Sequence, residues 1–117
     1  MSNLQERFIR TKTDRIQILN DAFRNNLTGG RIMFTAGIVA MGETMQRTIL
    51  ERIRTYDDFD ADDDPYGEHD FGMVEIGGHD IMFKIDYFAP DLEHGSADPS
   101  DPDKTCRVMT IMLASEY

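Results

Sequence analysis

A β-hairpin is the clearest local feature that the sequence predicts, and it falls in the run Phe71-Gly72-Met73-Val74-Glu75-Ile76-Gly77-Gly78-His79-Asp80-Ile81-Met82-Phe83-Lys84-Ile85-Asp86-Tyr87-Phe88. Its Gly-Gly pair supplies the positive backbone φ angles that a two-residue type I′ turn requires. After the turn, the side chains alternate between two sets with a period of two residues, which is typical of a strand with one buried face. The first set is Ile81, Phe83, Ile85 and Tyr87, and the second is Met82, Lys84 and Asp86. The pattern therefore predicts a hairpin over 71–88 with Gly77-Gly78 at its turn.

Upstream of the hairpin, apolar residues recur at helical spacing over 3–26, which predicts a helix there. The spacing is most regular over 14–25. Thr13 or Asp14 is the expected N-cap of that regular part, and Gly29-Gly30 is the expected stop. A strand is expected at 31–35. The amphipathic pattern of 43–56, with its glutamate first and its arginines last, predicts a second helix.

Downstream of the hairpin, residues 89–104 carry three prolines and four aspartates and are expected to form a long loop. Residues 106–113 are apolar on both faces, which predicts a strand in the centre of a sheet. The resulting order α-β-α-β-β-β predicts the α+β class, with an antiparallel sheet of about four strands and two helices packed on one face.

The 117 residues suit one domain, 1–117, in which residues 1–13 either begin the first helix or form a loosely attached N-terminal extension. The single cysteine, Cys106, excludes an intrachain disulfide, and it lies in an apolar run where a small core residue is expected. No apolar run is long enough to span a membrane, and the N-terminus does not resemble a secretory signal. These features predict a cytoplasmic protein without a membrane partner.

The net charge of −10 is unevenly distributed, because residues 57–103 hold sixteen of the 22 acidic residues and one basic residue, Lys84. Such a surface repels phosphate, so direct binding of nucleic acid is disfavoured and a basic protein partner is favoured. The expected partner-binding residues are the aspartates of the two loops, Asp57, Asp58, Asp60, Asp62, Asp63, Asp64, Asp98 and Asp101. The alternative is that these aspartates only keep two mobile loops in solution.

Two Glu-His pairs flank the hairpin strands on the side away from the turn, and that position would allow them to meet. Imidazole and carboxylate ligands suit Zn²⁺, Mn²⁺ or Fe²⁺, so a metal site, if there is one, is expected among Glu68, His69, Asp70, Glu93 and His94. The alternative is that the two histidines bind backbone carbonyls and fix the loops. The aspartate run fits an EF-hand loop in neither register, and no catalytic motif is recognisable, so no catalytic residue and no cofactor are assigned.

Several stretches resemble the bacterial family DUF3768, whose function is unknown. They include Asp64-Pro65-Tyr66-Gly67-Glu68-His69-Asp70-Phe71-Gly72, Glu93-His94-Gly95-Ser96, and the final run Arg107-Val108-Met109-Thr110-Ile111-Met112-Leu113-Ala114-Ser115-Glu116-Tyr117. The resemblance extends from about residue 14 to the end. It implies a place in bacterial genomes and their mobile elements, but no activity, cofactor or catalytic residue.

Three hypotheses of function follow. The first is an acidic, non-catalytic binding protein that imitates nucleic acid and inhibits a basic partner of host defence, of the anti-restriction or anti-CRISPR type. The second is a small metal-dependent enzyme that uses His69, His94 and nearby carboxylates. The third is a structural accessory protein without a specific ligand.

Overall fold

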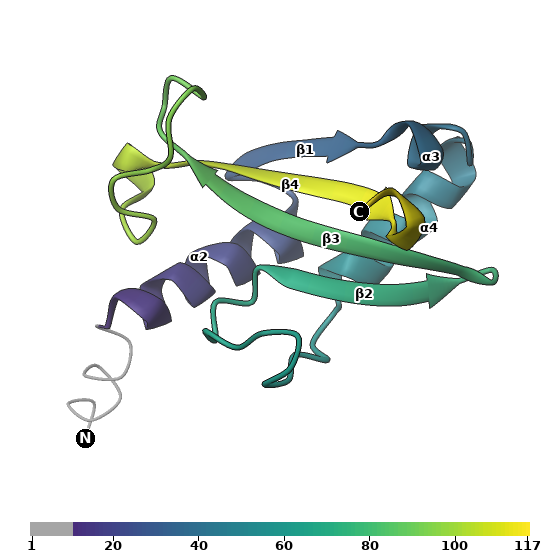
Figure 1. Ribbon diagram of the computed structural model, residues 1–117, viewed down its shortest axis with the longest axis horizontal. Helices are drawn as coiled ribbons and strands as arrows, with labels where there is room; N and C mark the ends of the chain where they lie inside the picture. The colour runs from purple at the N-terminus through teal and green to yellow at the C-terminus, as the bar shows by residue number, and fades with distance from the viewer. Residues whose placement is uncertain (1–10) are drawn as a thin grey trace.

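Four strands form one mixed sheet in the order β1-β4-β3-β2 (Figure 1). The structure, a computed structural model, describes residues 11–117. The strands are β1 (Gly30–Phe34), β2 (Phe71–Ile76), β3 (His79–Phe88) and β4 (Cys106–Leu113). The α+β class and the central position of the last strand are confirmed.

The edge strand β1 departs from the expected antiparallel arrangement, because it runs parallel to β4 with Ile32 opposite Met109. The other two neighbouring pairs of strands are antiparallel. Parallel neighbours need a long crossover between them, and here the chain from 35 to 105 provides it. Alternation within a strand says which face is buried but not which way a distant partner runs, so the sequence pattern did not reveal this pairing.

The predicted hairpin is confirmed, with Ile76 opposite His79 across a two-residue turn. Gly77 has φ +58° and Gly78 has φ +81°, the two positive values that a type I′ turn demands.

Three α-helices accompany the sheet in residues 11–117, namely α2 (Lys12–Asn26), α3 (Ala36–Val39) and α4 (Glu43–Arg54). Helix α2 lies within the predicted range 3–26, but its N-cap is Thr11 rather than Thr13 or Asp14, because the hydroxyl of Thr11 accepts from the Asp14 amide at 3.0 Å. Its end at Asn26 agrees with the predicted range, and its C-cap is Leu27, in the left-handed conformation at φ 56°, rather than one of the two glycines. Residues 3–10 of the predicted helix lie outside the described residues.

The short helix α3 was not expected. Its four residues complete only one turn, and a single turn has too few residues to show a helical period. The extended Thr35 precedes it, and the following helix α4 agrees closely with the predicted range 43–56.

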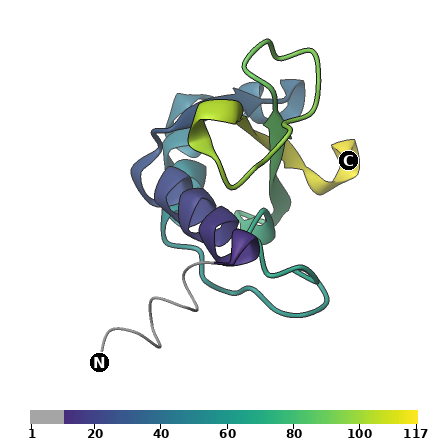
Figure 2. The same ribbon diagram turned by 90° about the vertical axis from the view of Figure 1, so that its left-hand side faces the viewer.

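Helices α2 and α4 cover the same face of the sheet, and the core lies between them and the strands (Figures 1 and 2). Phe23 of α2 and the two buried isoleucines of α4 belong to one core cluster with side chains of β2, β3 and β4. The fully buried members from the strands are Phe83, Ile81, Met109 and Ile111. Within residues 11–117, no helix combines the length and the apolar character needed to cross a membrane.

The long connection from β3 to β4 contains the short 3-10 helix η1 (Pro102–Lys104), and a second one, η2 (Ala114–Glu116), follows β4. The Glu116 carboxylate accepts from the Thr35 hydroxyl at 2.6 Å and from the amides of Gly37 and Leu113 at 2.9 Å each. These bonds hold η2 against the start of α3, and they lower the pKa of Glu116.

Candidate functional site

The segment 57–70 between α4 and β2, called the acidic loop from here on, carries the densest negative charge of the molecule. Five of its predicted partner-binding aspartates are exposed to solvent, namely Asp57, Asp58, Asp60, Asp62 and Asp63. Their exposure agrees with a role in contacting a partner, and it also leaves the solubility alternative open. The loop's internal contacts distinguish a mobile loop from a built surface.

One aromatic side chain, Phe59, anchors the acidic loop to the folded domain. Its ring is stacked on the imidazole of His69 with centroids 3.9 Å apart and an angle of 3° between the planes. The rings of Tyr56 and Phe83 meet it edge to face, and the guanidinium of Arg24 lies 4.8 Å from its centroid. Such contacts contribute both buried area and specific ring geometry, so they fix the start of the loop to α2, to β3 and to its own end at His69.

Two aspartates of the loop support its backbone. Asp60 accepts from the amides of Asp62 and Asp63 at 2.9 Å each, as aspartates commonly do in turns. Asp64 is only 8 % exposed, and its Oδ1 accepts from the amides of Glu68 and His69 at 3.0 and 3.1 Å. Among the predicted partner-binding aspartates of the loop, Asp64 thus differs from the others: its carboxylate turns inward, because the amides of Glu68 and His69 need an acceptor.

A buried hydrogen-bond network joins the end of the acidic loop to α2, β3 and β4. Its centre is Asn20, which is fully buried and whose amide donates to the Glu68 carbonyl at 3.0 Å and to the Tyr87 hydroxyl at 2.8 Å. The Asn20 carbonyl accepts from Nε of Arg107 at 2.7 Å, and Tyr87 donates to the Glu68 carboxylate at 2.7 Å. Arg107 also donates to the Pro99 carbonyl, so the network reaches the second long loop.

Burial sets the protonation of this network. Burial, with the hydrogen bond to Glu68, raises the pKa of Tyr87 far above its ordinary range, so the phenol remains a donor. Burial lowers the pKa of Arg107, while the nearby charges of Tyr87 and Glu68 act in the opposite direction. Their hydrogen bonds to Glu68 and Asn20 connect the end of the acidic loop to β3 and β4.

The two predicted Glu-His pairs do not come together. His69 bonds Asp21 of α2 at 2.9 Å, and Arg24 bonds the same carboxylate oxygen at 2.9 Å. His94 bonds Asp91 at 2.8 Å. Figures 1 and 2 both show segment 89–96, in green, and the acidic loop, in teal, projecting from opposite sides of the molecule.

The predicted metal ligands are therefore divided between two places. Within residues 11–117, the group whose ligand atoms all lie within 4.8 Å of one another consists of Asp91, Glu93 and His94, and all three are exposed. It contains Glu93 and His94 of the predicted set but neither Glu68, His69 nor Asp70. The sequence did not show that His69 forms its hydrogen bond with Asp21, which lies on the distant helix α2.

The remaining two predicted partner-binding aspartates lie in the second long loop and are occupied by their neighbours. Asp98 accepts from the hydroxyl of Ser100 at 2.6 Å, which with the Ser100 amide lowers its pKa, and it lies 3.7 Å from the ammonium of Lys12. Asp101 caps η1 by accepting from the amide of Asp103 at 2.9 Å. Both carboxylates thus stabilise their own loop.

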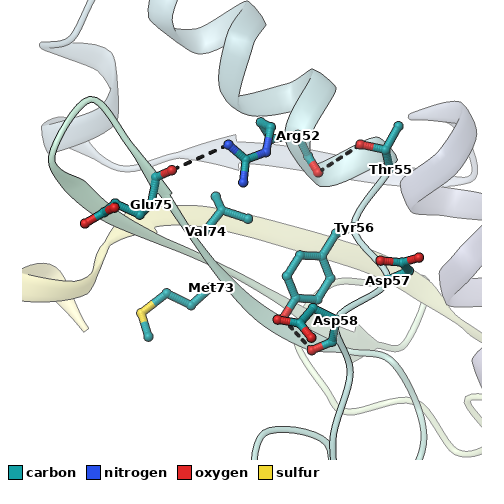
Figure 3. A pocket seen from close by; sticks show the side chains of 8 residues that line it. All are labelled: Arg52, Thr55, Tyr56, Asp57, Asp58, Met73, Val74 and Glu75. Atoms are coloured by element: carbon teal, nitrogen blue, oxygen red, sulfur yellow. Dashed lines mark hydrogen bonds between the residues drawn. The ribbon is translucent and has the colours of Figure 1, made fainter.

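Two cavities flank the acidic loop. The first, of about 340 Å³, lies between Asp57 and Asp58 on one side and Arg52, Met73 and Glu75 on the other (Figure 3). The second, of about 410 Å³, lies where the later part of the loop meets β2 and β3. The acidic loop therefore forms a wall of both.

Side chains cover part of the open edge of β2 in the first cavity. Arg52 donates to the Glu75 carbonyl at 3.5 Å, and the Tyr56 hydroxyl donates to the Asp58 carbonyl at 3.1 Å (Figure 3). Burial raises the pKa of Tyr56, although a hydrogen bond from the Met73 backbone lowers it in part. The Arg52 contact covers the Glu75 carbonyl of this edge strand, and covered polar groups on an edge hinder pairing with another chain.

Sequence reasoning missed the residues that hold the acidic loop, Phe59, Asn20, Tyr87 and Arg107. One of them left a signal: Asn20 lies four residues after Ile16 and three before Phe23, on the buried stripe of α2. A polar residue on such a stripe needs buried partners. Nothing local indicates which distant residues those partners are.

Comparison with known proteins gives one result. The family described as "Protein of unknown function (DUF3768)" matches residues 34–116, a shorter span than the resemblance from residue 14. Neither a curated protein nor a solved structure matches the chain. The match covers most of the 117 residues, from the end of β1 through η2, and the chain therefore belongs to the DUF3768 family.

Proposed function

We propose that this protein is a non-catalytic binding protein whose acidic loop docks on a basic protein partner. The observation that carries the proposal is the combination of exposed aspartates with a fixed backbone. Asp57, Asp58, Asp62 and Asp63 face solvent, while Phe59, between them, is stacked on His69. An acidic segment that only improves solubility has no need of such an anchor.

A fixed loop favours association for two reasons. Less conformational entropy is lost when a partner binds a surface that is already ordered, so more of the electrostatic attraction remains as affinity. Charges held in one place also steer a partner of opposite charge and raise its association rate.

The partner class we propose is a nucleic-acid-binding protein. The basic surface of such a partner attracts the negatively charged phosphates of nucleic acid. The closely spaced carboxylates of the acidic loop carry the same negative charge and can attract that surface too. Inhibition of host defence, of the anti-restriction or anti-CRISPR type, is one biological role of such a mimic. The net charge of −10, with most acids on residues 57–103, supports this choice and disfavours direct binding of nucleic acid.

The metal-dependent alternative has less support from the geometry. His69 and His94 bond to different aspartates, and Glu68 is engaged by Tyr87. The cluster of Asp91, Glu93 and His94 is fully exposed, and exposed acidic groups often lie together without a metal. We therefore propose no reaction.

The test compares two triple variants of equal charge. The first neutralises aspartates of the acidic loop whose side chains form no hydrogen bond or ion pair within residues 11–117, namely Asp57→Asn, Asp58→Asn and Asp62→Asn. The second neutralises exposed acids elsewhere, namely Glu43→Gln, Asp80→Asn and Asp103→Asn. The partner is captured from native cells, and its Kd for each form is measured at low and high salt.

We expect the loop variant to bind about tenfold more weakly, since three charge pairs of about 0.5 kcal/mol each amount to about 1.5 kcal/mol. The control variant should bind nearly as the wild type does, and the difference should shrink at high salt because screening shortens the range of the interaction. Equal losses in both variants, or none in either, would refute the proposal.

A further inference from the structure

The second cavity beside the acidic loop combines aromatic rings with carboxylates. It lies where the loop meets β2 and β3, and we call it the aromatic cleft. Its walls include three rings and three acids, Tyr66, Phe71, Tyr117, Asp63, Asp70 and Asp86. Its volume of about 410 Å³ is in the range of sites that accept a small ligand or a side chain.

The rings of the aromatic cleft are available to a ligand. Tyr66 and Tyr117 are each 80 % exposed, and Phe71 lies beside Tyr117 with centroids 6.4 Å apart and planes inclined by 48°. Exposed aromatic rings around a cavity are unusual on a strongly charged surface, and they commonly mark binding sites. Their electron-rich faces attract cations.

One carboxylate of the cleft lacks a compensating charge. Asp70 is partly buried, and among residues 11–117 no basic side chain forms an ion pair with it. Lys84, the lysine that lines the cleft, pairs instead with Asp86 at 3.2 Å. Burial, and then repulsion from Glu68, Asp64 and Asp86, raises the pKa of Asp70. A cation entering the cleft would relieve that repulsion.

We propose that the aromatic cleft binds an arginine side chain of the basic partner, between the rings of Tyr66 and Tyr117 and against the carboxylate of Asp70. A guanidinium suits this combination better than an ammonium does. It is planar and stacks on aromatic faces, and its parallel N–H groups match a carboxylate in pairs. This inference rests on the proposed function, because it names the group by which the partner is recognised.

The test uses the pentapeptide acetyl-Gly-Gly-Arg-Gly-Gly-amide, titrated into the full chain and followed by the amide NMR shifts of the protein. A peptide with citrulline in place of arginine keeps the planar shape but removes the charge, and a third peptide carries lysine. We expect the arginine peptide to shift the amides of Tyr66, Asp70, Phe71 and Asp86. The citrulline peptide should bind at least about tenfold more weakly, and the lysine peptide less tightly than arginine.

Variants separate the cleft from a general attraction of charge. Tyr66→Ala and Tyr117→Ala should each weaken arginine-peptide binding by about threefold to tenfold, whereas Tyr66→Phe, which keeps the ring, should not. Met33→Ala is the matched control, because Met33 is 53 % exposed and does not line the cleft. Equal binding of citrulline, shifts that miss the cleft, or no binding at millimolar peptide would overturn the proposal.

Failure here can be told apart from failure of the proposed function. The loop variant changes Asp57, Asp58 and Asp62, which do not line the aromatic cleft. If that variant weakens partner binding while the arginine peptide misses the cleft, the acidic loop acts alone and the cleft proposal is wrong. If the peptide occupies the cleft but the partner binds the loop variant and the wild type with the same Kd, the cleft proposal is supported and the acidic-loop proposal is wrong.

Discussion

Replacing Asn20 with alanine tests the network that holds the acidic loop. The substitution removes the partner of the Arg107 Nε at 2.7 Å, of the Tyr87 hydroxyl at 2.8 Å and of the Glu68 carbonyl at 3.0 Å. A buried charged donor left without its acceptor costs about 2–3 kcal/mol, and each neutral bond contributes about 1 kcal/mol. Alanine recovers roughly 0.5 kcal/mol through its higher helix propensity.

The free energy of unfolding should therefore fall by about 3.5–4.5 kcal/mol, a large share of the stability of a small domain. Urea unfolding followed by circular dichroism measures it, and the slope should stay constant. Asn25→Ala, at an exposed position of the same helix, is the control and should change stability by less than about 0.5 kcal/mol. A loss below about 1 kcal/mol for Asn20→Ala would refute the network as the element that fixes the loop.

The remaining predictions concern one charge, one anchor and one turn. Burial raises the pKa of Asp70 in the folded protein above its pKa in the unfolded chain. The folded state therefore gains stability from protonated Asp70 at a pH below the unfolded-state pKa, and it loses this gain as the pH rises through the folded-state pKa. Asp70→Asn should consequently raise the free energy of unfolding at pH 7 and leave it unchanged at strongly acidic pH, and a loss of stability at pH 7 would contradict this. Phe59→Ala should lower stability by about 2–3 kcal/mol, which is less than for a fully buried phenylalanine, and thermal unfolding will show whether the anchor matters. Gly78→Val should cost about 1–3 kcal/mol because a β-branched residue resists φ +81°, and unchanged stability in urea would disprove the turn.

Local patterns in the sequence predicted the local parts of the fold. The hairpin follows from a glycine pair between two alternating runs, and α4 follows from its apolar stripe. The parallel pairing of β1 with β4 joins residues more than seventy positions apart, and no periodicity records such a contact. The α+β class was therefore accessible, whereas the direction of the edge strand was not.

The candidate site shows the same division. The charge of the acidic loop could be predicted from composition, but its order could not, because Phe59 is held by Arg24 of α2, by Phe83 of β3 and by Tyr56, which follows α4. The expected meeting of His69 with His94 failed for a related reason. Each imidazole is hydrogen-bonded to a different carboxylate, His94 to Asp91 and His69 to Asp21. Asp21 is distant from His69 in sequence, so no local pattern indicates this pair.

The central claim is that the acidic loop is an ordered surface before any partner binds. Backbone ¹⁵N order parameters of the free protein test it most directly, for the amides of Asp62, Asp63, Glu68 and His69, which all donate to aspartates of the loop. We predict values near about 0.85, similar to those of β3 and β4. Values below about 0.6 at these positions would identify a mobile, solvated linker and would contradict the account.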